Sequence, residues 1–306
     1  KRLMFGTVYK STGSWYRVKL EDGKFIDCKL LGKFREKNIK STNPVCVGDF
    51  VKLNNSKENT PQIEFIFDRK NYLIRKSVKL SKQFHIIASN IDVCFLIITV
   101  KKPETSTMFI DRFLASTFSY NIDTVLLFNK VDDISDEDVN TFKTFLETYK
   151  SAGYDCLEIS GKKGINIDKL KLIMKGRSCV FSGHSGVGKS TLINRLDPNI
   201  NIKTLPISKS NLSGQHTTTF SEMHDLEFGS RIIDTPGIKG FGLFDVSNLE
   251  LKDFFKEFIG IEQCKFNNCL HHNEPGCNVK ILVENGSISR SRYDNYIQLL
   301  EEIQNS

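Results

Sequence analysis

The residues that could most clearly do chemistry form a glycine-rich segment near the middle of the chain. Residues 183–190 read GHSGVGKS and fit the pattern GxxxxGKS, directly after an apolar run and directly before a segment with helical character. Glycines let successive backbone N–H groups turn toward a phosphate, and the start of a helix adds partial positive charge. We predict that Lys189 neutralises the β- and γ-phosphates of a nucleotide and that the Ser190 hydroxyl holds Mg²⁺. The predicted nucleotide contacts here are Gly183, His184, Ser185, Gly186, Val187, Gly188, Lys189, Ser190 and Thr191.

A second segment, Arg231–Gly237, completes the phosphate end of the predicted site. It reads RIIDTPG, in which an apolar run ends at Asp234 and Gly237 completes the pattern Asp-x-x-Gly. A carboxylate at this place can support Mg²⁺ from just outside its ligands, and the Gly237 amide can sense the γ-phosphate. Asp234 and Gly237 therefore join the predicted nucleotide site.

The polar segment Ser208–Thr219 lies between these two motifs and is typical of a first switch loop, in which a threonine closes on Mg²⁺. Its triplet of threonines at 217–219 leaves three candidates, of which we favour Thr218 as magnesium ligand and catalytic residue. The residue after Gly237 is Ile238, which cannot orient an attacking water as a glutamine does in Ras-like enzymes. We expect His216 to take this catalytic role, since an imidazole can orient water, with packing of the loop as the alternative role.

The identity of the base is predicted by residues 129–132, which read NKVD and follow the apolar run Thr124–Phe128. Asp132 can accept two hydrogen bonds from N1 and N2 of guanine, which adenine lacks, so a P-loop ATPase is the disfavoured alternative. Asn129 would support the other edge of the ring, and the stem of Lys130 would cover its face. Ser160 follows the next predicted strand, where a backbone amide could meet the guanine O6. The sequence therefore predicts GTP and GDP as ligands.

The order of these motifs is unusual, because the guanine-reading NKVD precedes the phosphate-binding loop, with which an ordinary GTPase begins. The same sheet forms from either order if the old termini are joined and a new cut is made at a surface connection. The predicted second switch, which follows Asp234, then leads directly into the C-terminal part of the chain.

Three cysteines and a histidine near the C-terminus have the spacing of a metal site. Cys264, Cys269, His271 and Cys277 supply three thiolates and one imidazole, a normal closed set for structural Zn²⁺. A disulfide is the alternative, and His272 is the alternate ligand, although its side chain should point away if His271 points in. We predict one zinc ion that holds a small domain together.

The remaining sequence indicates the elements that position these motifs. Five short strand-like runs, at residues 5–9, 15–20, 25–31, 45–53 and 62–67, suggest a small closed barrel of the OB type, a common platform for single-stranded nucleic acid, with a purely structural or protein-binding role as the alternative. Alternating apolar runs and amphipathic segments from about residue 90 predict a doubly wound α/β sheet, and the chain turns helical after residue 246. We expect an OB-fold barrel at 1–68, a circularly permuted GTPase domain at 69–246 and a zinc-binding helical domain at 247–306.

Composition narrows the class of protein without deciding its function. The 306 residues are 39% hydrophobic and 26% charged, with a formal net charge of +7, which suits a polyanionic partner such as nucleic acid. No apolar run approaches the roughly 20 residues needed to cross a bilayer, and no signal peptide is visible. We expect a monomer with no membrane partner.

With these motifs in place, the chain resembles the circularly permuted GTPases of the ribosome small subunit-dependent GTPase A (RsgA) family. The likeness covers nearly the whole chain, from the barrel with residues 47–49, Arg75 and residues 87–92, through the nucleotide motifs, to the zinc pattern and the closing Arg292-Tyr293. One departure from some related GTPases is Gly186, which stands where they carry a potassium-binding asparagine, and this puts potassium activation in doubt.

The resemblance implies a bacterial cytoplasmic assembly factor that binds the small ribosomal subunit and its rRNA late in maturation and is stimulated there to hydrolyse GTP. It also implies a catalytic role for His216. A GTP-gated RNA-binding scaffold, in which turnover matters little, is the rival hypothesis.

Overall fold

The computed structural model describes residues 3–31, 43–54, 60–76, 84–200, 221–234 and 246–305. By its internal contacts the chain divides into two compact units, which are described separately. The first combines residues 1–93, 168–181 and 189–240, and the second combines residues 94–167, 182–188 and 241–306. None of the helices in the described part of the chain is long and apolar enough to span a membrane.

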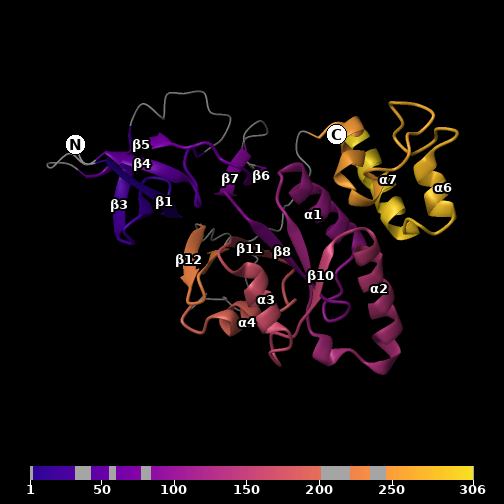
Figure 1. Ribbon diagram of the computed structural model, residues 1–306, viewed down its shortest axis with the longest axis horizontal. Helices are drawn as coiled ribbons and strands as arrows, with labels where there is room; N and C mark the ends of the chain where they lie inside the picture. The colour runs from indigo at the N-terminus through magenta and orange to yellow at the C-terminus, as the bar shows by residue number, and fades with distance from the viewer. Residues whose placement is uncertain are drawn as a thin grey trace, which may run out of the picture. The chain divides into compact units, whose positions relative to one another are not determined.

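A closed five-stranded barrel begins the first unit (Figure 1). Its strands are β1 (Leu3–Ser11), β2 (Tyr16–Leu20), β3 (Phe25–Leu30), β4 (Phe50–Asn54) and β5 (Gln62–Ile66). They pair in the order β1-β2-β3-β5-β4, and β4 returns to β1, so no strand is left at an edge. Alternate residues point inward, and Val8, Val18 and Leu53 are fully buried in its core. The barrel predicted from the sequence is confirmed.

One predicted strand begins later than expected. Residues 45–53 read as a single run, but β4 starts only at Phe50 because residues 46–49 form a turn around the buried carboxylate of Asp49. Asp49 accepts hydrogen bonds from the Arg69 guanidinium at 2.6 and 2.7 Å and from the Ser89 hydroxyl at 2.6 Å. The turn therefore links the barrel to the hairpin formed by β6 (Tyr72–Lys76) and β7 (Phe84–Ser89), which the sequence did not predict.

The rest of the first unit holds the strands that precede two of the nucleotide motifs. Strand β11 (Ser178–Ser182) leads into the phosphate loop and runs parallel to β13 (Ser230–Asp234). Strand β12 (Glu222–Leu226) pairs antiparallel with β13, and helices α3 (Ile167–Met174) and α4 (Lys189–Leu196) complete this part. Every residue of β11 is buried, as expected for a central strand of an α/β sheet.

The second unit contains three parallel strands and most of the helices (Figure 1). Strands β8 (Val93–Ile98), β9 (Thr124–Phe128) and β10 (Asp155–Glu158) lie in the order β10-β9-β8 and alternate along the chain with α1 (Thr107–Ser119) and α2 (Val139–Ser151). Three further helices follow: α5 (Asn248–Leu251), α6 (Asn278–Glu284) and α7 (Arg290–Gln304). Helix α7 packs on α1, which joins the C-terminal residues to the α/β part of this unit.

Candidate nucleotide and metal sites

The predicted phosphate loop has a backbone that favours glycine at three points. Gly183, Gly186 and Gly188 have φ angles of +153°, +87° and +96°, and a Cβ on Gly188 would lie 2.5 Å from the Asn129 side-chain nitrogen. A Cβ on Gly183 would lie 2.7 Å from the Ile97 carbonyl oxygen. The glycines therefore permit the close approach of the guanine-reading and phosphate-binding segments.

Asn129 is the residue that joins these two segments. Its side chain is buried, and its Nδ2 donates to the Val187 carbonyl, 58 residues away in the sequence, at 2.7 Å. Its Oδ1 accepts from the Gly161 amide at 3.2 Å, so it also holds the loop that follows β10. The neighbouring Lys130 donates from Nζ to the Gly186 carbonyl at 2.8 Å. NKVD and residues 183–188 of the phosphate loop therefore lie together in the second unit.

The residues predicted to read the base lie at the carboxyl ends of β9 and β10. Asp132 lies in a short 3₁₀ turn, Val131–Asp133, with its carboxylate exposed and available to a ligand. Ser160 is fully buried, its amide donates to the Ile165 carbonyl at 3.2 Å, and its hydroxyl accepts from the Lys163 amide at 2.9 Å. Ligand sites of α/β proteins form at this edge of the sheet.

The residues predicted to hold the phosphates and Mg²⁺ follow β11 and β13. Lys189, Ser190 and Thr191 form the first turn of α4, whose N-terminus follows the loop directly. Asp234 is the last residue of β13, and because β13 is parallel to β11, it lies at the edge of that pair from which the phosphate loop departs. His216, the threonines at 217–219, Gly237 and Ile238 lie outside the described residues.

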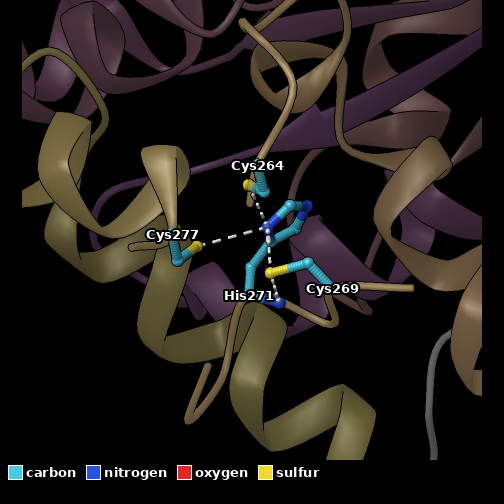
Figure 2. Close-up of side chains that lie close together, drawn as sticks. All are labelled: Cys264, Cys269, His271 and Cys277. Carbon is cyan, nitrogen blue, oxygen red and sulfur yellow. Dashed lines mark hydrogen bonds between the residues drawn. The ribbon is translucent and has the colours of Figure 1, made fainter. Parts of the chain in front are cut away.

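The cysteine and histidine side chains predicted to bind zinc converge on one point (Figure 2). The Sγ atoms of Cys264, Cys269 and Cys277 lie 3.6, 3.5 and 3.3 Å from His271 Nδ1, and all four ligand atoms are within 4.8 Å of one another. A tetrahedral Zn²⁺ with ordinary Zn–S and Zn–N bonds requires S···N separations of about 3.5 Å. All three cysteines are free, which disfavours the disulfide alternative, and His271 rather than His272 belongs to the cluster. The donor set fits zinc.

The protonation states of the three buried side chains of the cluster couple metal binding to pH. Burial lowers the pKa of His271, so its imidazole is neutral at pH 7, the form that binds a metal. Burial raises the pKa of the Cys269 thiol to about 12 and also raises that of Cys277. These thiols keep their protons until a cation displaces them, so binding should release protons.

Helix α7 supports this cluster through two tyrosine hydroxyls. One of these tyrosines, Tyr293, belongs with Arg292 to the family resemblance, which does not predict what either residue contacts. Tyr293 donates its hydroxyl to the His271 carbonyl at 2.7 Å, and Tyr296 donates to the Leu270 carbonyl at 2.6 Å. Arg292 is 1% exposed and donates to Asp111 at 2.5 Å and to Glu257 at 2.6 and 2.8 Å. The sequence shows only an arginine just before two tyrosines in a helical segment, and this pattern does not predict that Arg292 pairs with Asp111, 181 residues away.

Two family models match the chain. The model described as RsgA GTPase matches residues 66–244, and the model described as RsgA N-terminal domain matches residues 5–63. Among curated proteins, the small ribosomal subunit biogenesis GTPase RsgA of Christiangramia forsetii is 56% identical over 302 residues, which cover 97% of this chain and 96% of that protein. The protein of the same name from Flavobacterium johnsoniae is 52% identical over 302 residues, covering 97% and 93%.

Two solved structures share the fold. The crystal structure of YjeQ from Thermotoga maritima is similar with a TM-score of 0.82 and 35% sequence identity, over 100% of both chains. The structure of YloQ, described as a circularly permuted GTPase, gives a TM-score of 0.78 at 28% identity, over 99% of this chain and 96% of that one. The similarity in each case extends through the barrel, the nucleotide motifs and the C-terminal residues.

Proposed function

The chain belongs to the RsgA GTPase family, and from this premise we propose that it assists late maturation of the small ribosomal subunit, which stimulates it to hydrolyse GTP to GDP and phosphate. It is a GTP hydrolase with the circularly permuted fold. The relatives at 50–56% identity over nearly the full chain carry the name of a small-subunit biogenesis GTPase, and this supports the proposed partner.

The proposed nucleotide site rests on the contacts between the NKVD segment and the phosphate loop. The buried Asn129 donates to Val187, and Lys130 donates to Gly186, although NKVD comes earlier in the chain. A ligand that spans a base-reading edge and a phosphate loop therefore finds both in one place without a further rearrangement of the second unit. This supports the interpretation that permutation preserved the site.

Guanine is read by Asp132 in this proposal. Its exposed carboxylate would accept two hydrogen bonds from the base, Asn129 would support the opposite edge, and the Lys130 stem would cover the ring face. The Ser160 amide, expected from the sequence to meet the guanine O6, donates instead to the Ile165 carbonyl at 3.2 Å and is not a free donor. Replacing Asp132 by Asn should change the preference toward xanthosine nucleotides, because the amide donates where the carboxylate accepted. Competition binding between GTP and XTP measures this, and unchanged GTP selectivity would contradict the assignment.

The phosphates are held by the backbone of 183–188 and by Lys189. Bound Mg²⁺ would neutralise charge on the phosphates as the terminal P–O bond breaks, with Ser190 and Thr218 as its ligands and Asp234 behind them. In the same proposal the Gly237 amide detects the γ-phosphate and His216 orients the attacking water. Lys189 and Ser190 extend from the start of α4, whose N-terminus favours the negative charge of the phosphates.

The Cys264, Cys269, His271 and Cys277 cluster is proposed to hold one structural Zn²⁺. Four protein ligands leave no open position for catalysis, so the ion would stabilise the C-terminal residues. We also propose domain boundaries at 1–68, 69–246 and 247–306, the last segment being the one that contains this cluster.

The barrel offers the kind of surface that rRNA requires. Lys29 on β3 lies over the ring of Trp15, in the turn before β2, with its Nζ 4.6 Å from the ring centre. Arg17 on β2 lies over the ring of Phe25 on β3, 5.1 Å from its centre. Trp15 and Phe25 are 44% and 45% exposed, so this surface combines exposed aromatic and basic side chains, as surfaces that bind single-stranded RNA do. We propose that this surface contacts rRNA and that the protein acts as a monomer in the cytoplasm.

A GTP-gated RNA-binding scaffold is the second candidate, favoured by one residue, Ile238, where a water-orienting glutamine would stand. Single-turnover GTP hydrolysis on and off the small subunit separates the two. Scaffold behaviour predicts that subunit binding depends on the nucleotide while hydrolysis stays slow in both states.

A further inference from the structure

The phosphate loop is in contact with the end of β8, the segment that connects β8 to α1, and the first turn of α1. A Cβ on Gly183 would meet Ile97, and one on Gly186 would lie 3.4 Å from the Pro103 ring. The third contact is between aromatic rings: the imidazole of His184 and the ring of Phe109 have centres 3.8 Å apart, at 36° to one another. Phe109 matches none of the nucleotide motifs in the sequence.

His184 has a particular position in the loop. Gly183 and Gly186 carry no side chain and Ser185 is small, so His184, which is itself exposed, is the one large side chain in the first half of the loop. Glycine-rich backbone loses more entropy than other backbone when it is ordered around a ligand. A contact that holds His184 in the free protein therefore lowers the cost of binding.

Phe109 is itself held firmly. It lies in the first turn of α1, where its amide donates to the Ser106 hydroxyl at 3.3 Å. Two residues further along, Asp111 is fully buried and accepts from Arg292 and Asn295 of α7. Helix α1 is thus fixed by a buried ion pair, and the Phe109 ring is a stable support for the loop.

We propose that Phe109 is a positioning residue for GTP binding: its ring holds His184 and so keeps the first half of the phosphate loop in its binding conformation. The proposal rests on the proposed nucleotide site and names a residue that acts on it without touching the nucleotide.

The test compares the affinities of full-length variants for fluorescent mant-GDP and mant-GTP at 25 °C. Phe109→Leu should weaken both by roughly 2- to 12-fold, the range for loss of one aromatic pair, and Phe109→Tyr should restore binding because it keeps the ring. Phe118→Leu is the matched control, since Phe118 is also a partly buried phenylalanine on α1 but contacts Phe254, with ring centres 6.2 Å apart, rather than the loop. It should bind as the parent does.

A double-variant comparison separates positioning from general loss of stability. His184→Ala and Phe109→Leu remove the same contact. The nucleotide affinity of the double variant should therefore be no lower than that of the single variant with the lower affinity. Parent-like affinity of Phe109→Leu, or effects that multiply in the double variant, would overturn the inference. Failure of the parent chain itself to bind mant-GDP would overturn the proposed function, and this inference with it.

Discussion

Arg292 should be essential to the stability of the second unit, because it is the only cation in direct contact with two buried carboxylates among the described residues. It donates to Asp111 and Glu257, whose side chains are 0% and 7% exposed, and its guanidinium lies 4.9 Å from the ring centre of Phe255. With Arg292 the group carries one net negative charge, and without it two negative charges remain in a region from which water is excluded.

The expected cost follows from this charge count. Removing one partner of a buried ion pair costs about 3–5 kcal/mol, because the remaining charge is left uncompensated. For a unit of this size, 1 kcal/mol moves a thermal midpoint by about 2–4 °C, so Arg292→Met should lower the midpoint of the second unit by roughly 6–20 °C. The thermal midpoint of Arg292→Lys should lie between those of the parent and Arg292→Met, since a lysine keeps the charge but cannot reproduce the forked contact with Glu257.

The loss should depend on pH in a defined direction. Burial raises the pKa of Asp111, and Arg292 is the largest influence that opposes this rise. Without Arg292 the pKa rises further, so the folded variant binds a proton at a pH where the unfolded chain does not. The stability of the variant should therefore increase, relative to the parent, as pH falls through that raised pKa, and level off below about 3.9, the usual value for an aspartate.

The assay is thermal unfolding followed by circular dichroism, with hydrogen exchange at α1 and α7 to locate the loss. Arg112→Gln is the matched control, because Arg112 joins the same two helices through a partly exposed pair with Glu302 at 2.7 Å and should cost no more than about 1 kcal/mol. If the Arg292→Met chain unfolds at the parent's thermal midpoint at pH 8, Arg292 does not stabilise the two buried carboxylates.

Three further predictions concern the sites themselves. Gly188→Ala should weaken GTP binding at least tenfold, because a Cβ there would lie 2.5 Å from the Asn129 amide nitrogen; isothermal titration checks this, and full affinity would show that the loop tolerates the methyl group. Chelation of zinc should lower the thermal midpoint and release the C-terminal residues to proteolysis while leaving mant-GDP binding measurable, and an unchanged midpoint would argue against a structural metal; the same chelation of a Cys277→Ser chain should have little further effect. His216→Ala should reduce GTP turnover on small subunits by roughly 10²–10⁴-fold with little change in nucleotide affinity, and equal turnover would remove His216 from the catalytic residues.

Much of the architecture could be predicted because its signals are local. The run Thr124–Phe128 is apolar from Val125 onward and is followed by the polar Asn129 and Lys130, and it is strand β9 with those same limits. Ile167–Met174 likewise forms one of the helices that alternate with the strands from about residue 90. The residues of the metal cluster could be named because a zinc site needs few residue types at short spacing, and the structure brings those four together.

What the sequence did not predict depends on contacts between distant residues. The hairpin β6–β7 has no turn signal of its own, and Asp49 joins it to the barrel through Arg69 and Ser89. The Arg292–Asp111 pair and the Phe109–His184 stack likewise join residues that no periodicity relates. Such contacts are set by tertiary packing, which a pattern along the chain does not contain.

The central claim, that this GTPase works on the small ribosomal subunit, is tested most directly by its GTP turnover with and without purified small subunits. We expect the free chain to hydrolyse GTP slowly. The rate should increase strongly when small subunits are added and should not increase comparably with large subunits. Equal turnover in all three conditions would contradict this claim.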